Sequence, residues 1–489
     1  MKHLLGAMAL SSALLTGAAW ADPTATAEAP AGIAATPAVD ASTATAASAA
    51  PEAMVAPATP EAAAAPAEPA AKAEPPKPDH GDTAWMLTAT ALVLLMTIPG
   101  LALFYGGMVR RKNVLGTMMH SLSAAAVVTV VWVLIGYSLA FGNGAGDALA
   151  PYIGGFDRIL MNNVGVDQLW TDAGGTAYTI PESLFMVFQM TFAIITVAIM
   201  SGAFAERMKY SAFLVFIALW VVAVYAPIAH WVWHAKGWLF GAGALDFAGG
   251  TVVHINSGIA GLVAAYLIGR RVGWGREPMA PHNLTLTLVG AGMLWVGWFG
   301  FNAGSWLGAD GRAAMAMLVT QVAAAAGALG WLAVERISRG RASLLGGASG
   351  AIAGLVVITP AAGMVTAGSA VLMGLIGGAF CFWGTTGLKR LLKADDSLDA
   401  FGLHGVGGIV GALLTGVFAT EFITGGVPVV MPLGKQLLVQ LEGVLATLVY
   451  SGVVTFILLK VVDVLIGLRV SEEAEYEGLD LSQHGERIE

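Results

Sequence analysis

Two histidines in apolar segments open the same short phrase, and they are the residues best suited to chemistry. His254 begins His-Ile-Asn-Ser-Gly-Ile-Ala-Gly, and His404 begins His-Gly-Val-Gly-Gly-Ile-Val-Gly. An ionisable side chain at membrane depth is costly, so it usually lines a pathway or has a polar partner. A repeated one favours two structural halves that each give one residue to a common site. The pattern predicts transport, with two unrelated core histidines as the plain alternative.

Adjacent neutral imidazoles can share a hydrogen bond and offer polar contacts to a small guest. Burial should keep both rings neutral, which makes the lining polar but uncharged. A metal site is disfavoured because the sequence lacks a third ligand at suitable spacing, and a hydrolase is disfavoured because Gly-x-Ser-x-Gly is absent. We therefore expect no enzyme, no metal and no cofactor.

The composition indicates a membrane protein. The chain of 489 residues is 57% hydrophobic and 11% charged, with a net charge of -8, which is outside the range of ordinary soluble domains. There is no basic stretch suited to nucleic acid. The single cysteine, Cys381, excludes an intrachain disulfide framework.

Eleven apolar segments between residues 84 and 467 are long enough, or nearly so, to cross a bilayer. The loops after the odd-numbered segments hold fourteen Lys and Arg residues, and the even loops hold four. This asymmetry predicts that the odd loops are cytoplasmic, with the N-terminus outside and the C-terminus inside. The segments centre near Leu94, Val131, Phe192, Leu219, Gly261, Trp295, Ala323, Ala351, Gly374, Gly411 and Val453.

The two histidine segments are the fifth and the tenth, so they cross in opposite directions and form an inverted repeat. Asp246 is expected to start segment five, which puts His254 about 12 Å along the helix, and His404 lies about 8 Å beyond Asp399. Both depths approach the middle of a core about 30 Å thick. The predicted fold is all-α and integral to the membrane: five plus five helices, with an eleventh across them.

The termini have their own signatures. Residues 1–21 resemble a cleaved signal peptide, with an uncleaved anchor as the alternative. Residues 22–82 are rich in Ala, Pro and Thr and predict a disordered extracytoplasmic tether. The membrane domain is then 83–468, and 469–489 is a cytoplasmic tail.

Aromatic and small polar residues cluster on the segments expected around the histidines. Segment three carries Phe188, Gln189 and Phe192, and segment four ends at Trp231 and Trp233. These tryptophans are either interfacial anchors or part of a cage that holds a small cation by cation–π attraction.

These phrases together resemble the ammonium transporter family (Amt/Mep/Rh), closest to its bacterial Amt branch. The resemblance covers essentially everything from about residue 84 to the C-terminus, and it is carried by residues 97–107, 243–256, 297–305 and 401–408.

The resemblance implies a homotrimer in the bacterial cytoplasmic (inner) membrane, with one pore per subunit. By matching phrases, Trp233, Phe192 and Ser305 correspond to an outer ammonium-recruitment site, and Phe192 and Phe301 to the aromatic gate below it. His254 and His404 correspond to the pore pair. Asp246 matches an aspartate needed for transport, in a structural role or in deprotonation, although a plain helix N-cap explains it equally well.

The expected function is therefore ammonium transport, in which ammonium loses a proton near the gate and crosses the apolar pore as ammonia. We expect the proton to follow a separate polar route, so that net ammonium crosses. The tail resembles one on which a PII-type (GlnK-like) signalling protein docks, although it also fits a solvated acidic tail. An ammonium sensor and a passive ammonia channel are the rival functions.

Overall fold

The computed structural model describes residues 77–419 and 431–488, which belong to one compact unit beginning at Ala73. The predicted signal peptide and the tether up to residue 76 lie outside the described residues. The Asp79 carboxylate caps the first helix by accepting a hydrogen bond from the backbone N–H of Asp82. Residues 80–82, at the end of the predicted tether, are therefore helical.

The eleven predicted membrane segments are confirmed. Among the described residues, eleven helical spans are long and apolar enough to cross a bilayer, and each contains the expected centre. They run His80–Met108, Arg111–Phe141, Glu182–Phe204, Tyr210–Ala242, Gly250–Ile268, Leu284–Gly304, Gly311–Arg339, Leu344–Ala361, Ala367–Leu392, Phe401–Phe418 and Leu433–Leu465.

Most spans are divided into α, π (η) and 3₁₀ (η) pieces. The first five comprise α2 (His80–Leu95), η1 (Met96–Leu101), α3 (Ala102–Met108), η2 (Arg111–Asn113), α4 (Val114–Val131), η3 (Trp132–Gly136), α5 (Tyr137–Phe141), α6 (Glu182–Ser201), η5 (Gly202–Phe204), α7 (Tyr210–Trp220), η6 (Val221–Tyr225), α8 (Ala226–Trp233), α9 (Trp238–Ala242), η7 (Gly250–Ile255) and α10 (Asn256–Ile268). The next five comprise α11 (Leu284–Gly304), α12 (Gly311–Arg339), α13 (Leu344–Ile358), η8 (Thr359–Ala361), α14 (Ala367–Trp383), η9 (Gly384–Leu388), α15 (Lys389–Leu392), η10 (Phe401–Gly405) and α16 (Val406–Phe418).

Three prolines lie where membrane helices are irregular or end. Pro99 lies in η1 beside the non-helical Ile98, Pro227 stands in the first turn of α8 after the π-helical η6, and Pro360 lies in η8 at the end of span eight. Proline lacks the backbone N–H that would continue the helical ladder.

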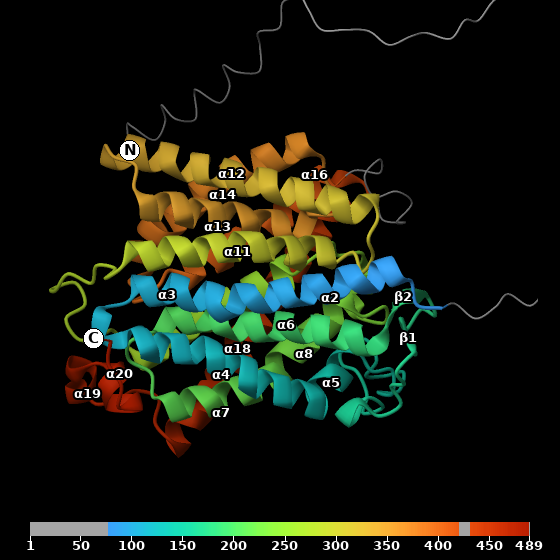
Figure 1. Cartoon of the computed structure of the whole chain (residues 1–489), viewed down its shortest axis with the longest axis horizontal. Coiled ribbons are helices and arrows are strands. Elements are labelled where there is room, and N and C mark those ends of the chain that lie inside the picture. The colour runs from blue at the N-terminus through green and yellow to red at the C-terminus, as the bar shows by residue number, and fades with distance from the viewer. Residues whose placement is uncertain (1–76, 420–430, 489) are drawn as a thin grey trace, which may run out of the picture. The chain divides into compact units, whose positions relative to one another are not determined.

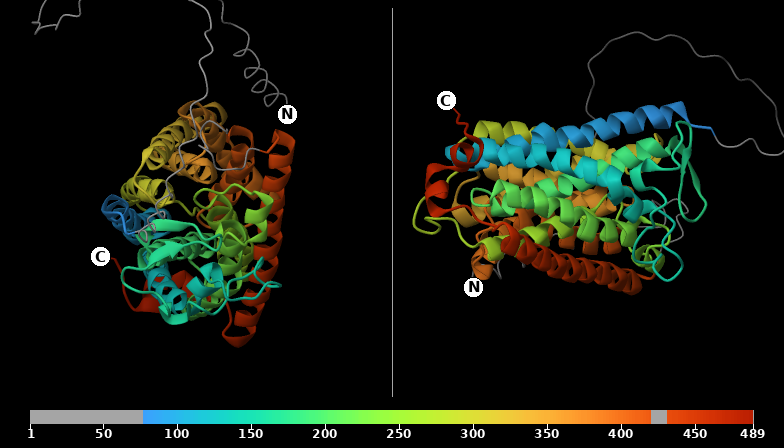
Figure 2. Two further views of the ribbon diagram at one scale, coloured as in Figure 1. Left: turned by 90° about the vertical axis from the view of Figure 1, so that its right-hand side faces the viewer. Right: turned by 90° about the horizontal axis from the view of Figure 1, so that it is seen from below.

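The remaining elements lie outside the ten-helix repeat. Figure 1 shows the antiparallel hairpin at one end of the bundle and the tail helices at the other. The helix α18, with 33 residues, is about 50 Å long, too long to cross a 30 Å core upright. Figure 2 shows it crossing the outside of the bundle obliquely, as predicted for the eleventh span. These elements are η4 (Ile159–Met161), β1 (Leu169–Thr171), β2 (Ala177–Pro181), α18 (Leu433–Leu465), α19 (Glu472–Glu477) and α20 (Leu479–His484).

Candidate functional site

The two histidines meet inside the bundle, as the repeat predicts. Each lies in a π-helical turn that begins its span, His254 in η7 and His404 in η10. Their Nδ1 atoms are 3.2 Å apart, and the ring centroids are 5.2 Å apart. The side chains are 0% and 3% exposed. The pair is therefore enclosed by protein, with an inter-ring hydrogen bond as its direct link.

The glycine of the repeated phrase explains how two helices approach this closely. A Cβ on Gly258, four residues after His254, would lie 2.5 Å from the Cα of Gly405. A Cβ on Gly408, four residues after His404, would lie 3.0 Å from the backbone nitrogen of Ile255. Gly258 thus packs on Gly405, the residue after His404. In the other half, Gly408 packs on Ile255, the residue after His254. Equivalent positions of the two repeated phrases therefore make equivalent contacts, as expected for an inverted repeat.

One inter-ring hydrogen bond fixes what the pair can offer. Of the two Nδ1 atoms, one donates and the other accepts, so the donating ring has a bare Nε2 and the accepting ring carries its single proton on Nε2. The pair then presents one Nε2 acceptor and one Nε2–H donor. The Nε2 atom of His254 is buried and has no hydrogen-bond partner among the described residues. The two roles exchange when a proton crosses the Nδ1–Nδ1 contact, a second proton leaves the Nε2 of the ring that receives it, and a third joins the Nε2 of the ring that gave it up.

Aromatic rings cover the pair on one side. The Trp298 ring stacks 5.4 Å from that of His254 and is held by a hydrogen bond from its indole N–H to Thr359. The Phe301 ring lies 6.0 Å from His254 and stacks 4.2 Å from the Phe192 ring. Phe301 and Phe192, the residues expected to form a gate, are both buried.

Trp233 lies next to Phe192, at the wall of a cavity. Its ring meets that of Phe192 edge-on at 5.8 Å, and its indole N–H donates to the carbonyl oxygen of Asp246 at 2.9 Å. Trp233, Ser305 and Gln189 line a cavity of about 390 Å³, which we call the vestibule. The Ser305 hydroxyl donates to the carbonyl oxygen of Phe301, so its oxygen lone pairs remain available as acceptors.

Asp246 caps the histidine helix from the preceding loop. Its carboxylate accepts four backbone N–H groups, from residues 249 to 252, at 2.7 to 3.1 Å. The expectation that Asp246 starts segment five is wrong by four residues, because η7 begins at Gly250. Burial raises the pKa of Asp246, and the four N–H donors oppose that shift. The carboxylate thereby fixes the turn that carries His254 and, through its own carbonyl, the Trp233 ring.

Replacing Asp246 with asparagine should lower the thermal stability of the purified protein. The amide nitrogen would face two of the four N–H donors, and each unsatisfied buried donor costs about 1–3 kcal/mol. We expect the melting temperature in detergent to fall by roughly 5 °C or more. Asp310→Asn is the matched control, because that N-cap uses a single carboxylate oxygen, Oδ1, for both of its N–H partners. Equal melting temperatures for the two variants would contradict the role assigned to Asp246.

Asp396 is a second helix cap that the sequence reasoning missed. It lies eight residues before His404, the same spacing as between Asp246 and His254, and it accepts the N–H groups of Ala400 and Phe401 at 3.0 and 2.8 Å. Burial raises the pKa of Asp396 to about 6. The Lys389 ammonium opposes this shift, and the negative charge of Asp399 adds to it. Asp399, from which the depth of His404 was measured, instead pairs with Lys389 at 2.7 Å. The equal spacing is the signal that identifies the counterpart of Asp246.

Buried ion pairs hold the loop that carries Asp396. Arg271 contacts Asp395 at 2.7 Å and Glu206 at 2.8 Å. Burial alone would raise the pKa of Asp395, but the Arg271 guanidinium outweighs it and holds that pKa below its usual range. Because Asp395 is next to Asp396, this network anchors the start of η10 and hence His404.

The tail packs on the same end of the bundle. Glu475 is buried, pairs with Arg469 at 2.7 Å and accepts the backbone N–H of Val272 at 2.6 Å. Asp480 accepts the N–H of Gly116 at 2.8 Å. The alternative of a wholly solvated acidic tail is therefore wrong for Glu475, while Glu472, Glu473 and Glu477 are exposed.

Comparisons with known proteins agree on one family. Residues 84–488 match the model of the Ammonium Transporter Family. An ammonium transporter of Bacillus subtilis (strain 168) is 51% identical over 409 residues, which cover 83% of this chain and 98% of the relative. The crystal structure of Saccharomyces cerevisiae Mep2 superposes with a TM-score of 0.74 at 38% identity, covering 81% of this chain and 89% of the other. A solved structure described as a sensor Amt protein has a TM-score of 0.74 at 29% identity, covering 83% and 98%.

Proposed function

This chain belongs to the ammonium transporter family, and from that premise we propose that it recruits ammonium at Trp233, deprotonates it and conducts ammonia past His254 and His404. The observation that carries the proposal is the histidine pair, enclosed by protein next to two stacked phenylalanine rings. The family is one of membrane transporters rather than enzymes.

Recruitment uses the chemistry of the vestibule. The face of an indole ring attracts a small cation, and the attraction grows when water is partly excluded. Ammonium also has four N–H donors and therefore needs acceptors. The Ser305 hydroxyl lines the same cavity as Trp233 and has oxygen lone pairs free for this purpose. Together, the ring and the hydroxyl favour ammonium over neutral ammonia at this point.

To pass the phenylalanine gate and the histidine pair, ammonium must lose its proton. Transfer of a full charge into low dielectric costs of order 20 kcal/mol in the idealised limit. Potassium and sodium cannot shed their charge, so an uncharged pore rejects them. Ammonium can lose its proton at the gate, after which ammonia crosses as a neutral molecule.

The proton follows a separate polar route through the histidine pair. The Nδ1–Nδ1 contact of 3.2 Å lets one ring hand a proton to the other, and the unpartnered Nε2 atom of His254 offers a place of entry or exit. Each cycle then moves one ammonia molecule and one proton, which makes the transport electrogenic.

Replacing Trp233 with leucine should weaken ammonium recruitment more than it slows conduction. Loss of a cation–π contact of about 1–2 kcal/mol is expected to raise the half-saturating ammonium concentration roughly tenfold. Uptake into proteoliposomes at graded ammonium concentrations measures this change. Trp383→Leu is the control, because that side chain is 48% exposed and does not line the vestibule. An unchanged half-saturation in Trp233→Leu would remove Trp233 from the recruitment site.

Assembly and regulation follow from the same premise. We propose a homotrimer in a bacterial inner membrane, with the vestibule in the periplasm, the tail in the cytoplasm and the signal peptide removed. The exposed glutamates of α19 and the neighbouring Tyr476 form the surface that a PII-type protein would contact. A sensor role is the second candidate function, because a structure described as a sensor Amt protein covers 83% of this chain.

Proteoliposomes separate the candidate functions. Purified protein is reconstituted with an internal pH dye, and an ammonium pulse is applied while membrane current and internal pH are recorded. A saturating current supports electrogenic transport. Faster internal alkalinisation without current indicates an ammonia channel. Ammonium binding with neither signal indicates a sensor and overturns the proposal.

A further inference from the structure

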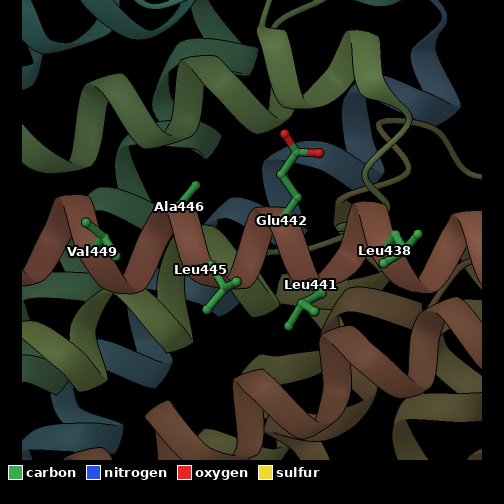
Figure 3. Close-up of a pocket in the computed structure, with 6 residues that line it drawn as sticks. All are labelled: Leu438, Leu441, Glu442, Leu445, Ala446 and Val449. Atoms are coloured by element: carbon green, nitrogen blue, oxygen red, sulfur yellow. The ribbon is translucent and has the colours of Figure 1, made fainter.

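One face of α18 points away from the bundle and carries a single carboxylate among apolar side chains. Its residues recur at helical spacing and line a surface groove of about 440 Å³. Val449 and Leu438 are 63% and 68% exposed, whereas Gln440 and Thr447, on the opposite face, are buried against the rest of the chain. Figure 3 shows the Glu442 side chain extended from the helix, with its carboxylate directed away from Leu441 and Leu445. The groove is lined by Leu438, Leu441, Glu442, Leu445, Ala446 and Val449.

The Glu442 carboxylate is available to a cation from the membrane. It is exposed on the outside of a membrane helix and has no hydrogen bond or ion pair among the described residues. A charge that faces the membrane is costly unless it reaches water, a headgroup or an opposite charge. An uncompensated carboxylate on this face is therefore unfavourable, and the membrane itself can supply the compensating cation.

Aromatic side chains indicate the depth of Glu442. The next residue, Gly443, lies over Leu239 of α9, which directly follows Trp238. The Trp238 ring contacts that of Trp231 at 5.8 Å, and Trp231 contacts Tyr450 of α18 at 4.6 Å. Tryptophan and tyrosine gather at the headgroup level of a bilayer. This places Glu442 near the headgroups on the vestibule side of the membrane.

A cation stands on the same face, closer to the start of the helix. Lys435 precedes Glu442 by seven residues, which is two helical turns or about 10.5 Å. It is exposed, and its ammonium has no partner among residues 77–419 and 431–488. Figure 2 shows α18 running obliquely across the bundle, so part of this separation lies across the bundle rather than along it. Their opposite signs match the phosphate and the ammonium of a zwitterionic headgroup.

We propose that this face of α18 binds one phospholipid whose zwitterionic headgroup carries a primary amine. The lipid ammonium donates hydrogen bonds to Glu442, the phosphate accepts from Lys435, and an acyl chain lies against Leu438 and Leu441. A primary ammonium has three N–H donors, whereas a trimethylammonium has none, so phosphatidylethanolamine fits this site and phosphatidylcholine does not. Exposed apolar side chains continue along the helix to Val453 and Ile457, and the opposite charges of Lys435 and Glu442 favour a lipid headgroup as the occupant of this face.

Native mass spectrometry of the delipidated full-length protein tests the proposal. The probes are phosphatidylethanolamine and phosphatidylcholine with identical acyl chains, titrated onto the wild type and the variants. We expect the wild type to bind phosphatidylethanolamine about tenfold more tightly, because a charge-assisted hydrogen bond is gained. Glu442→Gln should abolish this preference. Lys435→Gln should weaken the binding of both lipids by similar factors, because both lipids carry the phosphate.

A matched variant controls for the loss of an acid from α18. Asp463→Asn removes a carboxylate near the other end of the helix, beside Lys460, and should leave the preference unchanged. Equal binding of the two lipids to the wild type overturns the proposal, as does a preference that survives Glu442→Gln. A change in oligomer mass in Glu442→Gln, with an unaltered lipid preference, assigns this face to a second copy and also overturns it.

Discussion

Replacing His254 with aspartate is expected to let potassium pass through a pore that we expect to exclude it in the wild type. In the proposed mechanism the native pair is uncharged, so a cation that enters loses its hydration without compensation. A carboxylate at the same position supplies that compensation to any monovalent cation of suitable size. Potassium current through the variant in a planar bilayer should exceed the wild-type background at least tenfold, and selectivity for ammonium should fall.

The neutral variant His254→Asn controls for a change in shape. It removes the imidazole and leaves the site polar but uncharged, so it should stay impermeable to potassium while its ammonium transport falls. Potassium exclusion that persists in His254→Asp above pH 7 would contradict the view that selectivity rests on the absence of charge between the gate and His404.

Adding a single methyl group at Gly258 is expected to abolish most of the transport. The new Cβ would lie 2.5 Å from backbone atoms of Gly405 and 3.4 Å from the carbonyl carbon of His404, and backbone cannot yield as a flexible side chain does. Overpacking of this kind costs about 1–3 kcal/mol. Because the separation displaces His404 from His254, we expect uptake to fall tenfold or more, whereas the melting temperature should drop by only a few degrees.

Gly292→Ala provides the matched comparison for Gly258→Ala. Gly292 also lies within a membrane helix, α11, and a Cβ there meets no other heavy atom within 4 Å. Its uptake should equal that of the wild type. Normal uptake in Gly258→Ala as well would mean that the close crossing of the two histidine helices is not required for function.

The sequence predicted the spans and the histidine pair because both depend on strong, local signals. Apolar length alone locates a membrane helix, and all eleven expected centres fall within helices. The meeting of His254 and His404 follows from a repeated phrase on spans that run in opposite directions. The same logic, applied one step further, would have found Asp396, since it shares with Asp246 the spacing of eight residues to its histidine.

The features that could not be predicted depend on tertiary contacts. The π-helical turns that carry both histidines have no sequence signature at the level of hydropathy. The burial of Glu475 depends on Arg469 and on the backbone of Val272, more than 200 residues away in the chain. The groove on α18 also escaped notice, because a lone glutamate in an apolar helix does not reveal which way it faces.

Ammonium-triggered current in proteoliposomes, recorded for the wild type and for His254→Ala/His404→Ala, tests the central claim most directly. Each protein is given an ammonium pulse and then a potassium pulse of equal concentration. The account predicts a saturating ammonium current and no potassium current in the wild type, and a current that is lost or altered in selectivity in the double variant. Equal ammonium currents with unchanged selectivity in both proteins would contradict transport through the histidine pair.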